Sequence, residues 1–461
     1  MVRLIRTFST VEVRDVRKFL VSPFFNQRDD LVQLFDWIIR DEDLKKEAFW
    51  QQLNADLPFE EQKLRLLMSY LHGLLEQYIA IKELNGNPLQ VQLQLAIGYR
   101  KRGLGDALER VRKNLEKALE AQPLRNTFYH ETRYQLQWEV HQLAYPQDPT
   151  NLNGLQALST SADVLYLAQK LRLICLIAAH QSVYPSSAQG SPDPEEALIR
   201  VAERPDLAAL PAIATYLHCY RMLRHPTEET HFQQLKNLLL DPAGHFSAEE
   251  MHGLYILAIN YCVRQINAGL TRYFGEALDL YKVGLAKNYL LENGVLTRFT
   301  YHNVVASGIQ TGELDWVRYF INEYKNRLEK RYRESSFSYN LARLEYARHN
   351  HSFVLELLQK ANYRDPLLNL AAKTLLLKTY YALGEYDLLQ SHLDAMRNYI
   401  HRKRVIGYHR TNYLNTIRYT EKLIRLNTWD KKAAEELREA IDREEVLTEK
   451  SFFQKVLHVT Q

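Results

Sequence analysis

The feature that most constrains this sequence is a pattern of two helices joined by a tight turn, which repeats along the chain. Residues 379–396 carry apolar residues at helical spacing on both sides of Gly384, and glycine commonly ends a helix. The segments 339–366 and 301–324 show the same pattern, displaced by roughly 35 to 40 residues each time, with predicted turns at His349 to His351 and at Gly312. Because one amphipathic hairpin cannot bury its apolar face alone, neighbouring copies are expected to stack.

Three cysteines extend the pattern toward the N-terminus. Cys175, Cys219 and Cys262 each precede a predicted turn, and these turns are placed at His180, His225 and Asn267. An odd number of cysteines without a C-x-x-C pair argues against a disulfide framework and indicates a reducing compartment. A reactive thiol needs a nearby histidine or a helix N-terminus. These cysteines lie mid-helix, so we predict that they are buried and structural.

The repeats resemble a known family. Residues 298–400 are similar to the tetratricopeptide (TPR) repeat, whose key places are occupied by Leu341, Ala342, Val354, Leu358, Ala361 and Pro366. The two ends of the chain also look like those of large uncharacterised bacterial TPR-like proteins. The resemblance implies an all-α fold, an α-solenoid of TPR-like hairpins with about twenty helices and no sheet.

The N-terminal third also has helical patterning. Ser9 and Glu12 have the spacing of a capping box, and apolar periodicity predicts helices over residues 28–40, 60–84, 106–121 and 126–143. The stretch LQVQLQL at 89–95 alternates as a strand does. Since glutamine and leucine are good helix formers and Tyr99 continues a helical face, we favour a helix there, with a strand as the alternative.

Three regions are predicted along the chain. They are an N-terminal helical region, 1–150, the TPR-like repeats, 151–400, and a C-terminal basic helical hairpin with a capping helix, 401–461. Segments 145–154 and 184–196 are rich in Pro, Ser, Asp and Gly, so both are predicted to be loops.

Charge and hydropathy favour a cytoplasmic protein that does not associate with a membrane. The net charge of +4 comes from 59 basic and 55 acidic residues, which is too small a margin to imply nucleic acid or an anionic membrane by itself. Arg3, Arg6 and Arg14 interrupt the apolar residues at the start, which argues against a signal peptide. The longest apolar run, around residues 173–179, is too short to span a membrane.

The TPR resemblance also indicates a binding surface. In TPR-like arrays the first helices of successive hairpins line the concave side, and the resemblance places there His302, Tyr339, Arg343, Tyr346, Lys378 and Tyr381. Arg343 and Lys378 stand one repeat apart and could bind a carboxylate of an acidic peptide; the alternative is that both are simply solvated. We therefore expect a non-catalytic scaffold or adaptor that binds a protein or peptide partner.

A nucleic-acid binder is the second hypothesis. Residues 401–425 contain seven Lys or Arg against one acid, interleaved with tyrosines. Basic side chains can neutralise phosphates while tyrosines stack on bases, and the candidates are Arg402, Lys403, Arg404, Tyr408, Arg410, Tyr413 and Arg418. The competing interpretation is a solvated charged face with tyrosines in the core.

Catalytic and metal chemistry receive little support from the sequence. Glu228 with His231 and Glu249 with His252 have the i, i+3 spacing of di-iron bundles. Both pairs also fit helix starts, where Thr227 and Ser247 could cap and acids favour the positive end of the dipole. Walker, G-x-S-x-G and H-E-x-x-H motifs are absent. We predict no enzyme activity, no metal and no cofactor, and do not expect a small-molecule ligand.

Overall fold

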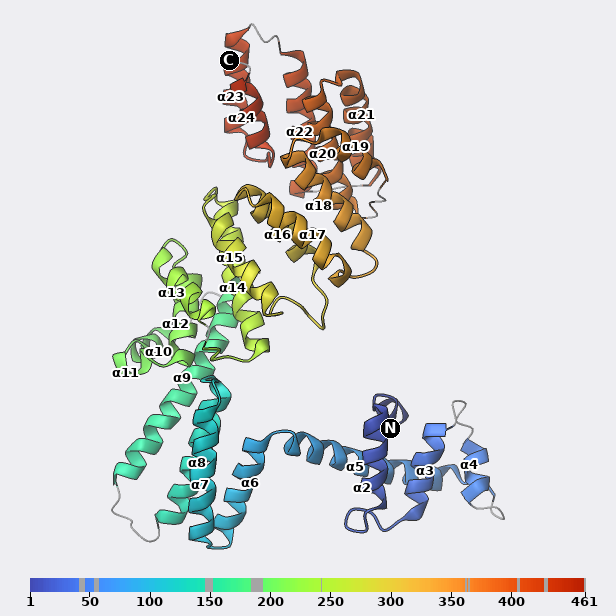
Figure 1. The fold of residues 1–461 in the computed structure, drawn as a ribbon, viewed down its shortest axis with the longest axis vertical. Coiled ribbons are helices and arrows are strands. Elements are labelled where there is room, and N and C mark those ends of the chain that lie inside the picture. Colours follow the sequence, from blue (N-terminus) through green and yellow to red (C-terminus); the bar gives the residue numbers. More distant parts are fainter. Residues whose placement is uncertain are drawn as a thin grey trace. The chain divides into compact units, whose positions relative to one another are not determined.

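The described part of the chain is all-α, as predicted. The computed structural model describes residues 1–40, 46–53, 58–145, 152–183, 194–241, 243–360, 363, 365–403, 407–426 and 430–459. These residues form 24 α-helices and no β-strand (Figure 1). The number exceeds the predicted twenty or so partly because α1 (Val2–Ile5) and α11 (Pro205–Ala208) have only four residues each, which is too short to show helical periodicity.

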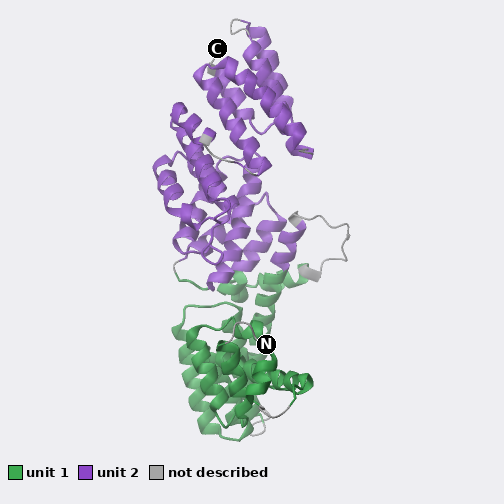
Figure 2. Cartoon of the chain, turned by 90° about the vertical axis from the view of Figure 1, so that its right-hand side faces the viewer, with its two compact units in different colours: residues 1–173, 190–214, 243–245 green, residues 174–189, 215–242, 246–461 purple. Residues whose placement is uncertain are grey.

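Contacts along the chain group it into two compact units (Figure 2). Unit 1 comprises residues 1–173, 190–214 and 243–245, and unit 2 comprises residues 174–189, 215–242 and 246–461. The three regions predicted from the sequence, 1–150, 151–400 and 401–461, stay a prediction, because a grouping by contacts does not say which segments fold independently.

The first eight helices belong to unit 1. After α1 they are α2 (Thr10–Val21), α3 (Asp29–Arg40), α4 (Lys46–Leu53), α5 (Glu61–Asn85), α6 (Pro88–Lys101), α7 (Gly105–Ala121) and α8 (Thr127–Ala144). Residues Val16, Leu34 and Leu71 are buried together where α2, α3 and α5 meet. A second cluster joins α6, α7 and α8 through buried leucines, including Leu93 and Leu115.

Five helices of the described residues follow next in the chain. They are α9 (Leu152–Val183), α10 (Pro194–Ala202), α11, α12 (Pro211–Arg224) and α13 (Glu229–Leu240). The predicted turn at His180 is wrong, because α9 continues to Val183. The predicted loop 145–154 ends earlier than expected, since α9 already begins at Leu152. Residues 146–151 and 184–193, the central parts of the two predicted loops, lie outside the described residues.

The C-terminal half of the chain is a run of helices that pair in order. They are α14 (Ala248–Asn267), α15 (Tyr273–Ala286), α16 (Arg298–Gln310), α17 (Leu314–Tyr324), α18 (Arg333–Ala347), α19 (His351–Lys360), α20 (Pro366–Leu383), α21 (Tyr386–Arg402), α22 (Gly407–Arg425), α23 (Lys431–Arg443) and α24 (Lys450–Val459), with a short 3-10 helix at Lys325–Arg327. Each helix from α14 to α21 contacts the next, and α16, α18 and α20 also contact one another in sequence. This is the neighbour-to-neighbour pattern that stacked hairpins produce.

Local signals in the sequence place several helix ends correctly. Ser9 begins α2 with the predicted capping box to Glu12, and Ser247 begins α14 with a capping box to Glu250. The alternating stretch 89–95 is helical and lies within α6. Thr227 does not cap α13, because that helix begins one residue later, after Glu228.

Tight turns between paired helices use the left-handed backbone conformation. Gly312 and Gly384 have φ of 79° and 74°, and His349 reaches 61° at the equivalent turn between α18 and α19. Glycine adopts this conformation without steric cost, whereas histidine does so less readily. All three positions are the turns predicted from the repeat.

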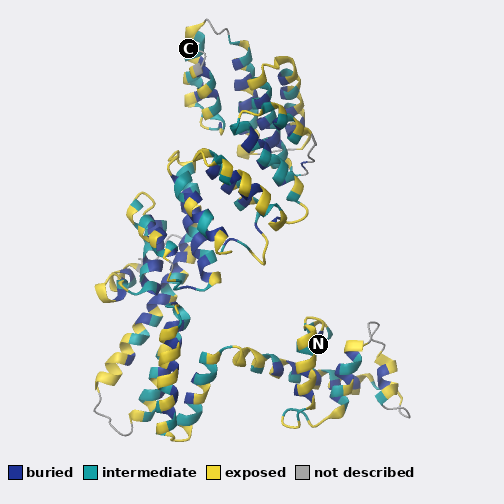
Figure 3. Cartoon of the chain, viewed as in Figure 1, coloured by how far each residue is buried: buried dark blue, intermediate teal, exposed yellow. Residues whose placement is uncertain are grey.

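Burial follows the helical pattern (Figure 3). In unit 2, Ala342 of α18 and Val354 of α19 have no exposed surface. They belong to a buried cluster that also contains Tyr363 and Leu375. Leu370, Leu389 and Leu393 form the next cluster between α20 and α21. The predicted burial of Cys175, Cys219 and Cys262 is confirmed, since all three have no exposed surface.

Replacing Ser247 by alanine should lower the free energy of unfolding by about 1 kcal/mol. The hydroxyl of Ser247 accepts a hydrogen bond from the backbone N–H of Glu250 in the first turn of α14, and this bond is part of the capping box that begins the helix. Urea unfolding would measure the change. Ser391→Ala is the matched control, because that serine is exposed on α21, and its effect should stay within about 0.5 kcal/mol.

Candidate functional site

The six residues predicted to bind a partner lie on three helices that contact one another in order. His302 is on α16, Tyr339, Arg343 and Tyr346 are on α18, and Lys378 and Tyr381 are on α20. All six side chains are half-buried. We call this set of six residues the α16–α20 face.

Arg343 is held in place by its neighbours. Its Nη1 donates hydrogen bonds to the backbone carbonyl of His302, at 3.1 Å, and to Oδ1 of Asn340, at 3.2 Å. Nδ2 of Asn340 lies 2.7 Å from Nδ1 of His302, and the rings of His302 and Tyr339 meet edge to face with centroids 5.6 Å apart. The guanidinium therefore has a fixed position between α16 and α18.

Burial changes the titration of groups on this face. It lowers the pKa of His302 to about 4, with the nearby cation of Arg343 acting in the same direction. The pKa values of Tyr346 and Tyr381 are raised to about 12, in both cases mainly by burial. At neutral pH these groups are uncharged, so Arg343 and Lys378 carry the charge among the six predicted residues.

Lys378 binds a carboxylate from the C-terminal part of the chain. Its Nζ donates to Oε2 of Glu449 at 2.6 Å, and the ammonium lies 5.7 Å from the ring centroid of Tyr346 and 5.9 Å from that of Phe452. The side chain of Lys378 is 18% exposed. Glu449 is a functional candidate that the sequence analysis missed, because the two partners are 71 residues apart.

Glu449 ends a segment that also lies along α22. Asn412 accepts a hydrogen bond at Oδ1 from the backbone N–H of Thr448, at 2.7 Å. Nδ2 of Asn415 donates to the backbone carbonyl of Val446 at 3.0 Å. Two side chains of α22 thus hold the backbone of residues 444–449, which connect α23 to α24.

The candidate residues for nucleic-acid binding lie in different environments. Arg402, Lys403, Tyr408 and Arg410 are exposed, and 57% of the Tyr408 surface is accessible. Arg404 lies outside the described residues.

The two remaining candidates for nucleic-acid binding are Tyr413 and Arg418. Tyr413 is half-buried, and burial raises the pKa of its hydroxyl. Arg418 is exposed but donates to Glu444 at 2.6 Å. Of the three tyrosines in the basic segment, Tyr419 is buried and its hydroxyl donates to the carbonyl of Ala440, which leaves Tyr408 as the tyrosine most available for stacking.

Only one of the two predicted histidine–glutamate pairs forms, since His231 lies near Glu228 whereas His252 lies near Tyr289 and Glu292. His231 Nε2 lies 3.8 Å from Glu228, and Nδ1 of His252 lies 2.6 Å from the carbonyl oxygen of Tyr289. Over the described residues, no group of three or more His, Cys, Asp or Glu side chains is arranged to hold a metal ion. Burial raises the pKa of the Cys262 thiol, which disfavours the thiolate that a nucleophile requires.

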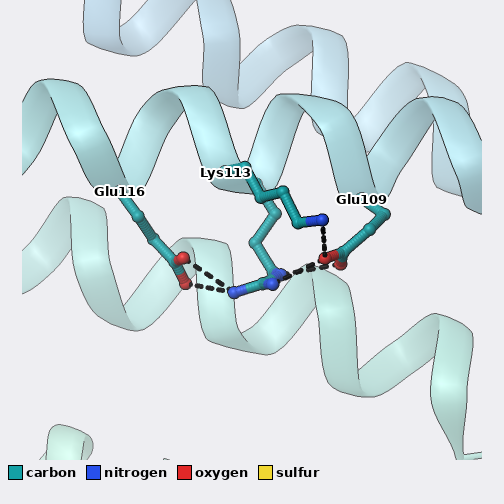
Figure 4. Close-up of polar contacts among 4 residues, drawn as sticks. Glu109, Lys113 and Glu116 are labelled. Carbon is teal, nitrogen blue, oxygen red and sulfur yellow. Dashed lines mark hydrogen bonds and ion pairs between the residues drawn. The ribbon is translucent and has the colours of Figure 1, made fainter.

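Unit 1 contains a cavity of about 300 Å³ between α7, α8 and α9. Its polar lining includes Arg112, Glu116, Gln137 and His141, and its apolar lining comes from leucine, valine and alanine side chains of the three helices. The guanidinium of Arg112 donates to Glu109 on one side and to Glu116 on the other, as Figure 4 shows together with Lys113. Both acids therefore neutralise the charge of Arg112 in the lining of this cavity.

The chain was compared with known proteins. No family model, no curated protein and no solved structure matches it. Within the described residues, no helix combines the length and the apolar character needed to cross a membrane.

Proposed function

We propose that this protein is a non-catalytic scaffold that binds a protein or peptide partner on the α16–α20 face. The observation that supports this most directly is the contact of Lys378 with Glu449, in which a cation of the face, set between Tyr346 and Phe452, takes up a carboxylate. The proposed setting is a cytoplasmic, TPR-like α-solenoid whose first helices present this face.

Arg343 provides the second anchor of the proposed site. Its Nη1 is turned inward to His302 and Asn340. The other two nitrogens of the guanidinium, Nε and Nη2, form the edge that binds carboxylates in a bidentate manner. Tyr339 lies under the guanidinium, 5.7 Å from ring centroid to Cζ. A fixed cation next to half-buried aromatic rings is the type of anchor that dominates protein interfaces.

Arg343→Glu should reduce capture of the partner at least tenfold. Full-length protein would be used as bait in a native cell extract, with and without nuclease, and the bound proteins identified by mass spectrometry. We expect a discrete protein at comparable stoichiometry that survives nuclease and is lost with Arg343→Glu, because a reversed charge repels an acidic partner.

Arg331→Glu is the matched control. Arg331 is 70% exposed and pairs with Glu329 outside the α16–α20 face, so its reversal changes the net charge equally and should leave capture unchanged. Equal capture by both variants would refute the proposed face. Loss of every bound protein after nuclease would favour the nucleic-acid hypothesis, in which Tyr408 and Arg410 on α22 are the residues to change next.

A further inference from the structure

Residues 444–449, with the sequence EEVLTE, lie against α20 and α22 in the way that a bound peptide lies on a receptor. Both ends are fixed by charge, since Glu444 accepts from Arg418 at 2.6 Å and Glu449 accepts from Lys378 at 2.6 Å. Leu447 between them is only 4% exposed. Two acidic ends and an apolar centre therefore match two cations and an apolar surface.

The backbone of the same segment is bound by two amide side chains. Asn412 accepts from the N–H of Thr448, and Asn415 donates to the carbonyl of Val446. Asn412 is itself buried, with 6% of its surface exposed. Residues 445 and 446 form a bend and residues 448 and 449 a turn, so the two amides hold a bent segment. Because they bond to backbone groups, they accept most side chains at those positions. We call Lys378, Asn412, Asn415 and Arg418 the α20–α22 clamp.

Outside the clamp, a hollow interrupts the contact between α22 and the hairpin of α23 and α24. A hollow of about 370 Å³ separates α22 from α23 and is lined by Lys422, Leu426, Leu437 and Ala440 among others. Apolar attachment comes from one buried cluster, in which Tyr419 and Leu423 of α22 lie with side chains of both α23 and α24. The hairpin side chains of this cluster are Leu437, Ile441, Phe453 and Leu457. The clamp adds polar contacts to this apolar cluster, and all of them are made to residues 444–449.

We propose that the α20–α22 clamp is a recognition site for an acidic segment of a partner protein, and that residues 444–449 occupy it within the same chain. This inference rests on the proposed function, since the clamp continues the α16–α20 face through Lys378. The partner segment carries two carboxylates flanking an apolar side chain, and it binds when the α23–α24 hairpin is released.

The test releases the internal segment without changing the clamp. Glu444→Arg with Glu449→Arg in the full-length chain places like charges opposite Arg418 and Lys378. A fluorescent peptide with the sequence of residues 443–450 is the probe, and its binding is followed by anisotropy. We expect the release variant to bind the peptide at least tenfold more tightly than wild type, and the backbone amides of residues 431–459 to exchange hydrogen faster.

A second release variant and a matched control distinguish release of residues 444–449 from general unfolding of the protein. Thr448→Pro removes the N–H that Asn412 binds and should give the same gain in peptide affinity with no change of charge in the clamp. Glu436→Arg with Glu439→Arg reverses two exposed acids of α23 outside the segment and should leave peptide binding and hydrogen exchange at the wild-type level.

Restoring the charge pairs should close the site again. Adding Lys378→Glu and Arg418→Glu to the Glu444→Arg, Glu449→Arg variant recreates both ion pairs in the opposite sense. Peptide binding should then fall to the wild-type level and the exchange of residues 431–459 should slow. Peptide affinity equal to wild type in both release variants, with α20 and α22 still protected from exchange, would overturn the inference; so would binding that survives the charge exchange. Capture that depends on Arg343 would in either case leave the proposed function standing.

Discussion

Gly308→Ala is expected to lower the free energy of unfolding by about 3 kcal/mol, because a side chain at this position overfills a closed helix contact. Gly308 is a buried residue of α16, and a Cβ atom added there would overlap Cγ2 of Val317 on α17. Val317 is fully buried and cannot move into solvent. Amide hydrogen exchange of α16 and α17 in urea would assign the loss to this hairpin.

A second glycine provides the control for this substitution. Gly253 lies within α14, and an added Cβ would have no neighbouring heavy atom within 4 Å. Gly253→Ala should therefore raise stability by about 0.5 to 1 kcal/mol through the loss of backbone entropy in the unfolded chain. Adding Val317→Ala to Gly308→Ala should recover part of the lost stability, since the overlap disappears. Equal effects of Gly308→Ala and Gly253→Ala would contradict the close contact.

His302→Gln should remove about 2 to 3 kcal/mol of the acid sensitivity of wild type between pH 7 and pH 4.5. The folded protein lowers the pKa of His302 to about 4, whereas the unfolded chain binds that proton near pH 6.5. Between these values the unfolded state holds more protons, so stability falls as the pH falls. Glutamine stays neutral and can still accept from Asn340.

Urea unfolding at several pH values would measure this difference. Above pH 7 the free energies of unfolding of wild type and His302→Gln should differ by a constant amount. Below pH 6.5 wild type should lose stability progressively faster than His302→Gln as the pH falls. His409→Gln is the matched control because His409 is exposed on α22, and its pH dependence should follow wild type. Parallel curves for wild type and His302→Gln down to pH 4.5 would contradict the role assigned to burial at this histidine.

Helix positions were predictable from the sequence because their signals are local. The capping box of Ser9 and Glu12 and the turn glycines Gly312 and Gly384 act within a few residues, and each was placed correctly. Errors arose where the local signal was ambiguous. His180 was predicted to be a turn, but the preceding helix continues past it to Val183, because histidine does not by itself end a helix.

The candidate site was only partly predictable. Repeat alignment indicated which residues share the first helices of the hairpins, and Arg343 and Lys378 lie on α18 and α20 accordingly. It gave no indication that Lys378 already has a partner in Glu449. Likewise, the basic segment suggested stacking tyrosines, whereas Tyr419 is buried against the C-terminal helices.

The sequence by itself determined an all-α chain, the places of most of its helices and the burial of its three cysteines, since periodicity, caps and turn residues act over a few residues. Only the tertiary structure decided which distant groups meet. The need for glycine at position 308 depends on how closely Val317 approaches, and the occupation of the clamp by residues 444–449 depends on how the last hairpin folds back on α20 and α22. Such contacts are set by the packing of whole helices, and no short stretch of sequence encodes them.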